Sequence, residues 1–135
     1  MDFIYQDPYP ILKDETQYRK ITSDFVKVEQ LGEREILNVD PKGLELLAQE
    51  AMRDVSFMLR TSHLEKLRAI LDDPEATDND RFVAYNLLQN AVVAIDGELP
   101  SCQDTGTAIV VGKKGENVYT GVDDAEYLSR GIFNT

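Results

Sequence analysis

Three successive stretches between residues 41 and 95 carry apolar residues at the spacing of an α-helix, and this pattern constrains the fold more than any other feature of the chain. Apolar residues three and four positions apart lie on one face of a helix, so each stretch predicts an amphipathic helix. The predicted helices cover residues 41–60, residues 63–72, and a third stretch that begins at Thr77 or Asp78 and ends before Gly97.

Two of these helices have recognisable first turns. Asp40 can accept a backbone hydrogen bond as an N-cap, and Pro41 would occupy the first helical position, where its missing N–H costs nothing. Ser62 and Glu65 have the spacing of a capping box, in which each side chain binds a backbone N–H of the same turn. These residues predict where the first and second helices begin.

β-Branched residues predict strands on both sides of the helical region. The segments FVKVEQL and REILNV, within residues 24–39, flank Gly32–Glu33, which suits a two-residue hairpin turn. The segments TGTAIVVG, residues 105–112, and NVYTG, residues 117–121, predict a second pair of strands. Because hairpins and helices are segregated along the chain, the predicted class is α+β, a bundle of three to four helices with antiparallel hairpin strands.

A last helix is predicted to open at Asp123, with Glu126 completing an acidic capping box. The chain then ends on SRGIFNT, with apolar residues still in phase and Gly131 as a candidate C-cap. This ending suits either a natural terminus that docks on the core or a chain cut within a longer protein. The pattern alone does not separate the two.

Size and charge exclude several classes of protein. The 135 residues, 42% of them hydrophobic, predict one globular domain large enough to bury a core. The net charge of −11 argues against nucleic acid and anionic membranes as partners, because both require a basic patch. The apolar runs, such as AVVAI, are too short to span a membrane, and the N-terminus lacks a secretory signal. With one cysteine and no internal disulfide, the sequence predicts a soluble, cytoplasmic protein.

Common catalytic motifs are absent from the sequence. It contains no GxGxxG, P-loop, HExxH or CxxC, and one histidine with one cysteine makes a protein-only zinc site implausible. His63 is predicted to be an exposed first-turn residue rather than a catalyst, because no nucleophile motif accompanies it. Lys113 and Lys114 are expected to lie in a solvated turn.

Cys102 is the strongest candidate functional residue. An isolated cysteine is most often a small buried hydrophobe, but this one lies on a loop rather than on an apolar stripe. Its neighbours are polar, and Gly106 would let the backbone approach another group closely. A thiolate beside Asp104 would be destabilised by like charge unless a cation lies nearby, and a metal centre is one such cation.

The stretch from LRTSHLEKL through ELPSCQDTGTAIVVGKKG to GVDDAEYLSRGIFNT resembles the N-terminal part of the class I fumarate hydratases, the iron–sulfur-dependent kind. The resemblance covers the chain from about residue 40 to the end, and SCQDTGTA is its most specific element. It implies a longer, homodimeric enzyme that reversibly hydrates fumarate to (S)-malate. The iron–sulfur tartrate dehydratases are similar around this motif, so tartrate or mesaconate stays open as the substrate.

The resemblance also implies roles for individual residues. Such enzymes hold a [4Fe–4S] cluster by three cysteines, and Cys102 corresponds to the first. Gln103 would bind a carboxylate or hydroxyl of the dicarboxylate substrate, and Asp104 would have a polar or proton-transfer role at the hydroxyl. The remaining cysteines, the cations that bind the substrate and the catalytic base are expected beyond Thr135. The chain would then be an N-terminal fragment that needs the missing C-terminal chain and is inactive alone.

Within a single domain, the expected parts are an N-terminal extension with a β-hairpin at residues 1–40, a helical region at 41–96, and the cluster-ligand loop, strands and helix at 97–135. The resemblance further implies a cytoplasmic enzyme of the tricarboxylic acid cycle. A function of another class is also open, namely a non-catalytic folding or interaction module in which Cys102 is spare.

Overall fold

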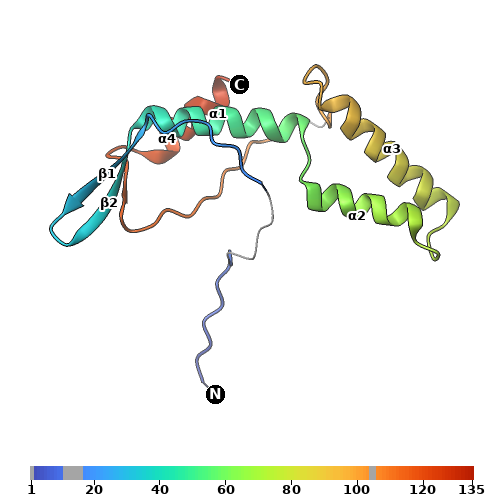
Figure 1. Ribbon diagram of the computed structural model, residues 1–135, viewed down its shortest axis with the longest axis horizontal. Coiled ribbons are helices and arrows are strands. Elements are labelled where there is room, and N and C mark those ends of the chain that lie inside the picture. The colour runs from blue at the N-terminus through green and yellow to red at the C-terminus, as the bar shows by residue number, and fades with distance from the viewer. Residues whose placement is uncertain (1, 11–16, 104–105) are drawn as a thin grey trace.

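The computed structural model describes residues 2–10, 17–103 and 106–135, which form four helices and a three-stranded sheet (Figure 1). In chain order the elements are β1 (Val26–Leu31), β2 (Arg34–Val39), α1 (Pro41–Phe57), α2 (Thr61–Asp72), α3 (Asp78–Ala94), β3 (Val118–Tyr119) and α4 (Asp124–Phe133). The α+β class predicted from the sequence is confirmed.

The predicted hairpin is formed by β1 and β2. The two strands pair antiparallel, from Val26 opposite Val39 to Leu31 opposite Arg34. The two-residue turn between them carries Gly32 at a φ of 64°, a conformation that residues with a side chain rarely adopt. A local signal in the sequence therefore sets the register of this hairpin.

The first helix, α1, begins where the sequence predicts. Asp40 Oδ1 accepts a hydrogen bond from the Lys42 amide at 2.9 Å, and Pro41 is the first helical residue. The helix ends at Phe57, before the predicted boundary, because the backbone becomes extended at Met58. The chain then crosses to α2.

The second helix, α2, begins two residues before its predicted start, and the predicted capping box of Ser62 and Glu65 is wrong. The N-cap is Arg60, whose side chain makes no capping hydrogen bond but whose carbonyl accepts the first two amide hydrogen bonds of the helix. These bonds start the helix at Thr61, so Ser62 already lies inside the first turn.

The third helix, α3, is capped by Thr77 rather than Asp78. Thr77 Oγ1 accepts from the Asp80 amide at 3.2 Å, and Asp80 Oδ2 accepts from the Thr77 amide at 2.9 Å. Both halves of a capping box are thus present. The helix ends at Ala94, ahead of Gly97, as the sequence predicts.

The predicted second hairpin is wrong. Thr105 lies outside the described residues. Residues 106–112 form no strand: their backbone is irregular and their apolar side chains are exposed. Instead, β3 pairs with β2 in parallel, with Leu37 opposite Val118 and Asn38 opposite Tyr119. Strand propensity does not choose a partner, and here β3 takes the open edge of β2, which makes the sheet mixed.

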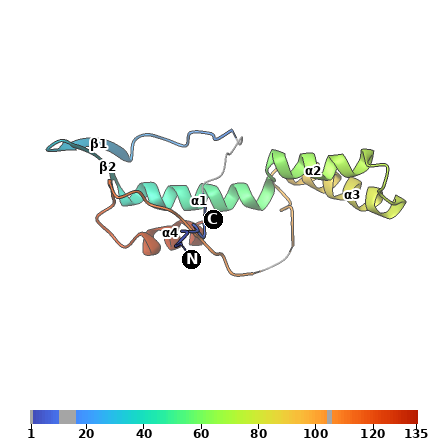
Figure 2. The ribbon, with the colours of Figure 1, turned by 90° about the horizontal axis from the view of Figure 1, so that it is seen from below.

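The fourth helix, α4, packs along α1 (Figure 2). It opens at Asp123 as predicted, and the Asp123 side chain accepts from the Ala125 amide at 3.0 Å. The predicted capping box with Glu126 is wrong, because Glu126 Oε1 instead accepts from Arg130 Nε at 3.1 Å. Gly131 is not the predicted C-cap, because the helix continues to Phe133 and Asn134 caps it. Gly131 is instead buried against α1, where its missing side chain lets the two helices approach closely.

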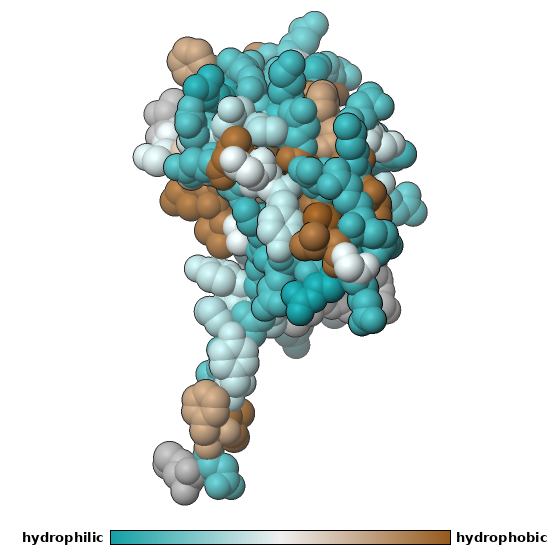
Figure 3. Space-filling model, turned by 90° about the vertical axis from the view of Figure 1, so that its left-hand side faces the viewer, coloured by the Kyte–Doolittle hydropathy of each residue, from teal (hydrophilic) through white to brown (hydrophobic). Residues whose placement is uncertain are grey.

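The expectation of a sizeable buried core is not met among the described residues. Their buried hydrophobic residues are Ala48, Ala84 and Ala94, all small. The helices pack in two pairs, α1 with α4 and α2 with α3, and Figures 1 and 2 both place the second pair beyond the end of α1. Each helix thus packs against one other helix, and hydrophobic side chains gather in patches on the surface (Figure 3).

Candidate functional site

The loop that follows α3 carries Cys102 on the surface. Cys102 is exposed, as is its neighbour Gln103, and the pair lies at the end of a turn-rich segment that starts at Gly97. Asp104, the third predicted site residue, lies outside the described residues. Cys102 and Gln103 are therefore both exposed on the loop that follows α3.

Ser101 fixes the base of this loop. Its amide donates to the Ser56 carbonyl at 2.8 Å, and its Oγ donates to the same oxygen at 3.1 Å. The Asn90 side chain, from α3, donates to the Ser101 carbonyl at 2.7 Å. The residue before Cys102 is therefore held by both α1 and α3, a set of contacts that the sequence pattern does not reveal.

A cavity of about 360 Å³ lies at this junction, between the last turns of α1 and the residues after α3. Arg19 lines it and binds Glu50 Oε2 at 2.9 Å and Asp54 Oδ1 at 3.0 Å. The hydrogen bonds that Arg19 donates to Glu50 and then to Asp54 raise the pKa of its guanidinium above the ordinary value. Its charge is thus already balanced by two carboxylates, which makes it a poor anchor for an anionic substrate.

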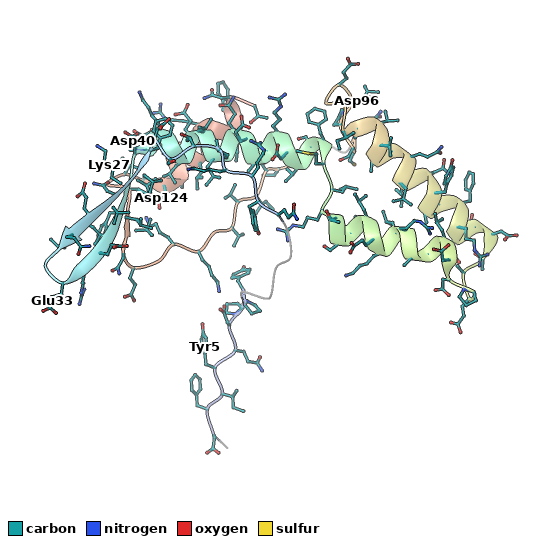
Figure 4. The ribbon with its side chains drawn as sticks, viewed as in Figure 1. Tyr5, Lys27, Glu33, Asp40, Asp96 and Asp124 are labelled. Atoms are coloured by element: carbon teal, nitrogen blue, oxygen red, sulfur yellow. The ribbon has the colours of Figure 1, made fainter. Side chains whose placement is uncertain are left out.

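The two lysines after the loop are not simply solvated, which corrects the expectation for Lys113 and Lys114. Lys113 Nζ binds Asp7 Oδ2 at 2.6 Å, and Lys114 binds Asp124 at the start of α4. Figure 4 shows Asp124 where α4 begins, close to the end of the sheet. The segment that leads away from Cys102 is therefore tied to the N-terminal segment and to α4.

Asp124 is a carboxylate with a shifted pKa. The hydrogen bond from Lys114 is the largest cause, and the hydroxyl of buried Thr120 adds a second bond, so the pKa of Asp124 falls below its ordinary value. The N-terminus of α4 also favours a negative charge at this position. The network holds the carboxylate in its ionised form.

Asp124→Asn is therefore expected to lower the melting temperature at neutral pH, with a penalty that disappears in acid. A depressed pKa stabilises the folded state above the unfolded value of 3.8, and this contribution is lost as the pH falls through the folded pKa. Asp78→Asn is the matched control, since Asp78 is the first residue of α3 as Asp124 is of α4. Melting curves from pH 7 to acid test this, and an equal penalty for both variants at every pH would contradict it.

The described residues do not make up a complete metal site. No group of three or more histidine, cysteine, aspartate or glutamate side chains within 2–10, 17–103 and 106–135 is placed to hold a metal ion. His63 is exposed in the first turn of α2, as predicted. A cluster with three cysteine ligands therefore does not fit this set alone, and Cys102 supplies one thiolate ligand at most.

None of the helices in the described part of the chain combines the length and the apolar character needed to cross a bilayer.

Comparison with known proteins places residues 45–135 in the family described as fumarate hydratase (Fumerase). The chain is 54% identical over 133 residues to the class I, anaerobic fumarate hydratase of Escherichia coli, and 51% identical to the class I, aerobic fumarate hydratase of Salmonella typhimurium. It is 52% identical over 122 residues to the mitochondrial fumarate hydratase 1 of Leishmania major. These matches cover 98%, 98% and 89% of this chain but 24%, 23% and 22% of the three relatives.

Proposed function

The chain belongs to the fumarate hydratase family, and from this membership we propose that it is one part of a hydro-lyase that reversibly hydrates fumarate to (S)-malate. The observation that carries the proposal is 54% identity over 98% of the chain to a class I fumarate hydratase. The relatives' names favour fumarate over tartrate as the dicarboxylate. Because the chain spans about a quarter of these relatives, the activity belongs to a larger protein than the residues described.

The proposal assigns Cys102 as one of three thiolate ligands of a [4Fe–4S] cluster. When bound, such a cluster supplies an iron without a protein ligand, a Lewis acid for the hydroxyl that is added or lost. The exposure of Cys102 on a loop held at its base by Ser101 supports this assignment, since a ligand must be accessible and fixed in place. The other two thiolates must come from outside this chain, which has a single cysteine.

Gln103 and Asp104 are proposed to bind the substrate. Gln103 follows the ligand directly and is exposed, so its amide can donate to a carboxylate or accept from a hydroxyl group. Asp104 is proposed to have a polar or proton-transfer role at the substrate hydroxyl, the latter being that of a general acid or base. The proposal further describes the whole enzyme as a cytoplasmic homodimer of the tricarboxylic acid cycle.

The isolated 135-residue chain is expected to show no turnover of fumarate. It contributes one thiolate, and the Arg19 cation beside the loop is paired with two carboxylates, so neither a cluster nor a dicarboxylate is held. The measurement is the ultraviolet absorbance of fumarate after anaerobic treatment with iron and sulfide. The full reading frame, treated identically, is expected to turn brown and consume fumarate, and its failure to do so would refute the proposed function.

A further inference from the structure

We propose that Asn90 is a positioning residue for Cys102, acting through Ser101. The Asn90 Nδ2 atom donates to the Ser101 carbonyl oxygen at 2.7 Å, across 11 residues of sequence. That carbonyl and the Cys102 amide belong to one planar peptide group. Asn90 therefore fixes the plane from which the Cys102 side chain departs, and with it the direction in which the thiol can point.

The other side of Ser101 is held as firmly. Its amide and its hydroxyl both donate to the carbonyl of Ser56, at 2.8 and 3.1 Å. Ser56 lies in the last turn of α1, where carbonyls have no amide partner within the helix. With Asn90 on one side and Ser56 on the other, Ser101 has little freedom to rotate its backbone.

Asn90 lies within α3, where an asparagine is less favourable than an alanine. Asn86, one turn earlier, shows the ordinary behaviour of such a residue, because its side chain donates to Phe82 within the same helix at 2.7 Å. Asn90 instead reaches out of the helix to the loop. The two asparagines are thus a natural pair, both exposed on one helix, of which one holds the Cys102 loop.

The contacts of Ser101 also join the two helix pairs. The α2–α3 pair follows α1 through the short segment 58–60, and Ser101 links the end of α1 to α3 at Asn90, near the C-terminal end of that helix. Loss of the Asn90 bond would therefore loosen the loop and the junction together. The orientation of Cys102, the next residue, would change most directly.

The test uses the full-length protein, because the thiol must sit in its native surroundings. Iron is removed with a chelator and an oxidant, and the thiols are then reduced. The protein is labelled with iodoacetamide, and the labelled fraction of the Cys102 peptide is measured over time by mass spectrometry. Asn90→Ala is expected to raise the labelling rate about fivefold, the effect of losing one hydrogen bond of ordinary strength. Asn90→Asp is expected to do the same, since an ionised carboxylate cannot donate to a carbonyl.

Asn86→Ala is the matched control and is expected to label like the wild type. Both alanine variants gain the same helix propensity and each loses one side-chain hydrogen bond, so labelling measured well below both melting temperatures separates positioning from a general loss of stability. Should Asn90→Ala fold poorly, Ser101→Ala removes only the hydroxyl bond and is expected to give a smaller increase. Equal labelling rates in the Asn90 and Asn86 variants would overturn the proposal.

The positioning role of Asn90 rests on the proposed function only where it predicts how firmly iron is retained. In the iron-loaded protein, Asn90→Ala is expected to lose iron in air faster than Asn86→Ala. If Cys102→Ser retains its full iron content, the ligand role of Cys102 is refuted, while the labelling comparison still decides whether Asn90 positions the thiol.

Discussion

Gly131→Ala is expected to destabilise the full-length protein by about 2 kcal/mol, because it forces α4 away from α1. A Cβ atom on Gly131 would lie 2.1 Å from the Glu45 carbonyl oxygen and 2.7 Å from the Ala48 Cβ. Neither atom is the end of a flexible side chain, so the helices themselves must separate. Thermal or urea unfolding of the variant measures the loss.

Whether Gly131→Ala raises or lowers the free energy of unfolding distinguishes helix propensity from the contact between α1 and α4. In an isolated helix, replacing glycine with alanine stabilises by about 1 kcal/mol, so helix propensity and the helix contact predict opposite results. Gly112→Ala is the matched control, since nothing lies within 4 Å of its added Cβ and its φ is not positive. A Gly131 variant as stable as the wild type would show that α1 and α4 do not approach so closely.

The elements that the sequence predicts well are those set by adjacent residues. Asp40 with Pro41 opens α1, and Gly32 turns the hairpin, because caps and tight turns depend on only two to four residues. The sequence pattern wrongly predicts Gly131 as a C-cap, because its role depends on Glu45 and Ala48, more than 80 residues earlier. Partners so distant leave no periodic trace in a single sequence.

The second hairpin fails for a related reason. The β-branched run at 107–111 has the composition of a strand, but a strand exists only where another edge accepts its hydrogen bonds. The open edge of β2 is taken by β3, whose pairing is parallel and short. Composition therefore predicted that a sheet exists, and tertiary contacts decided which residues enter it.

The candidate site also combines features that local sequence predicts with contacts that it does not. The polar neighbours of Cys102 predict a loop position, and Cys102 lies on an exposed loop after α3. The resemblance to class I fumarate hydratases is confirmed by the comparison with known proteins. The bond from Asn90 to Ser101 and the pair formed by Lys113 with Asp7, 106 residues apart, join distant segments and had no signature in the sequence.

Under the proposed function, Cys102→Ser is expected to reduce fumarate hydration by the full-length protein more than about 100-fold, beyond the 10- to 100-fold typical of losing an outer-shell partner of a metal site. A serine hydroxyl has nearly the shape of the thiol but is not deprotonated at neutral pH, so it cannot replace a thiolate ligand. The iron and sulfide content after anaerobic reconstitution should fall together with activity. Because Cys102 is exposed, the substitution leaves no cavity, and the melting temperature of the iron-free protein should not change.

Glu98→Gln in the same loop provides the control for this loss. Glu98 is exposed and precedes the residues that Ser56 and Asn90 hold, so its variant should retain both iron and activity. A Cys102→Ser enzyme that loses iron while Glu98→Gln keeps it would trace the defect to the missing thiolate rather than to the loop. A Cys102→Ser enzyme with normal iron content and normal turnover would instead favour a spare cysteine, because an enzyme cannot lose one of three cluster ligands and keep both properties.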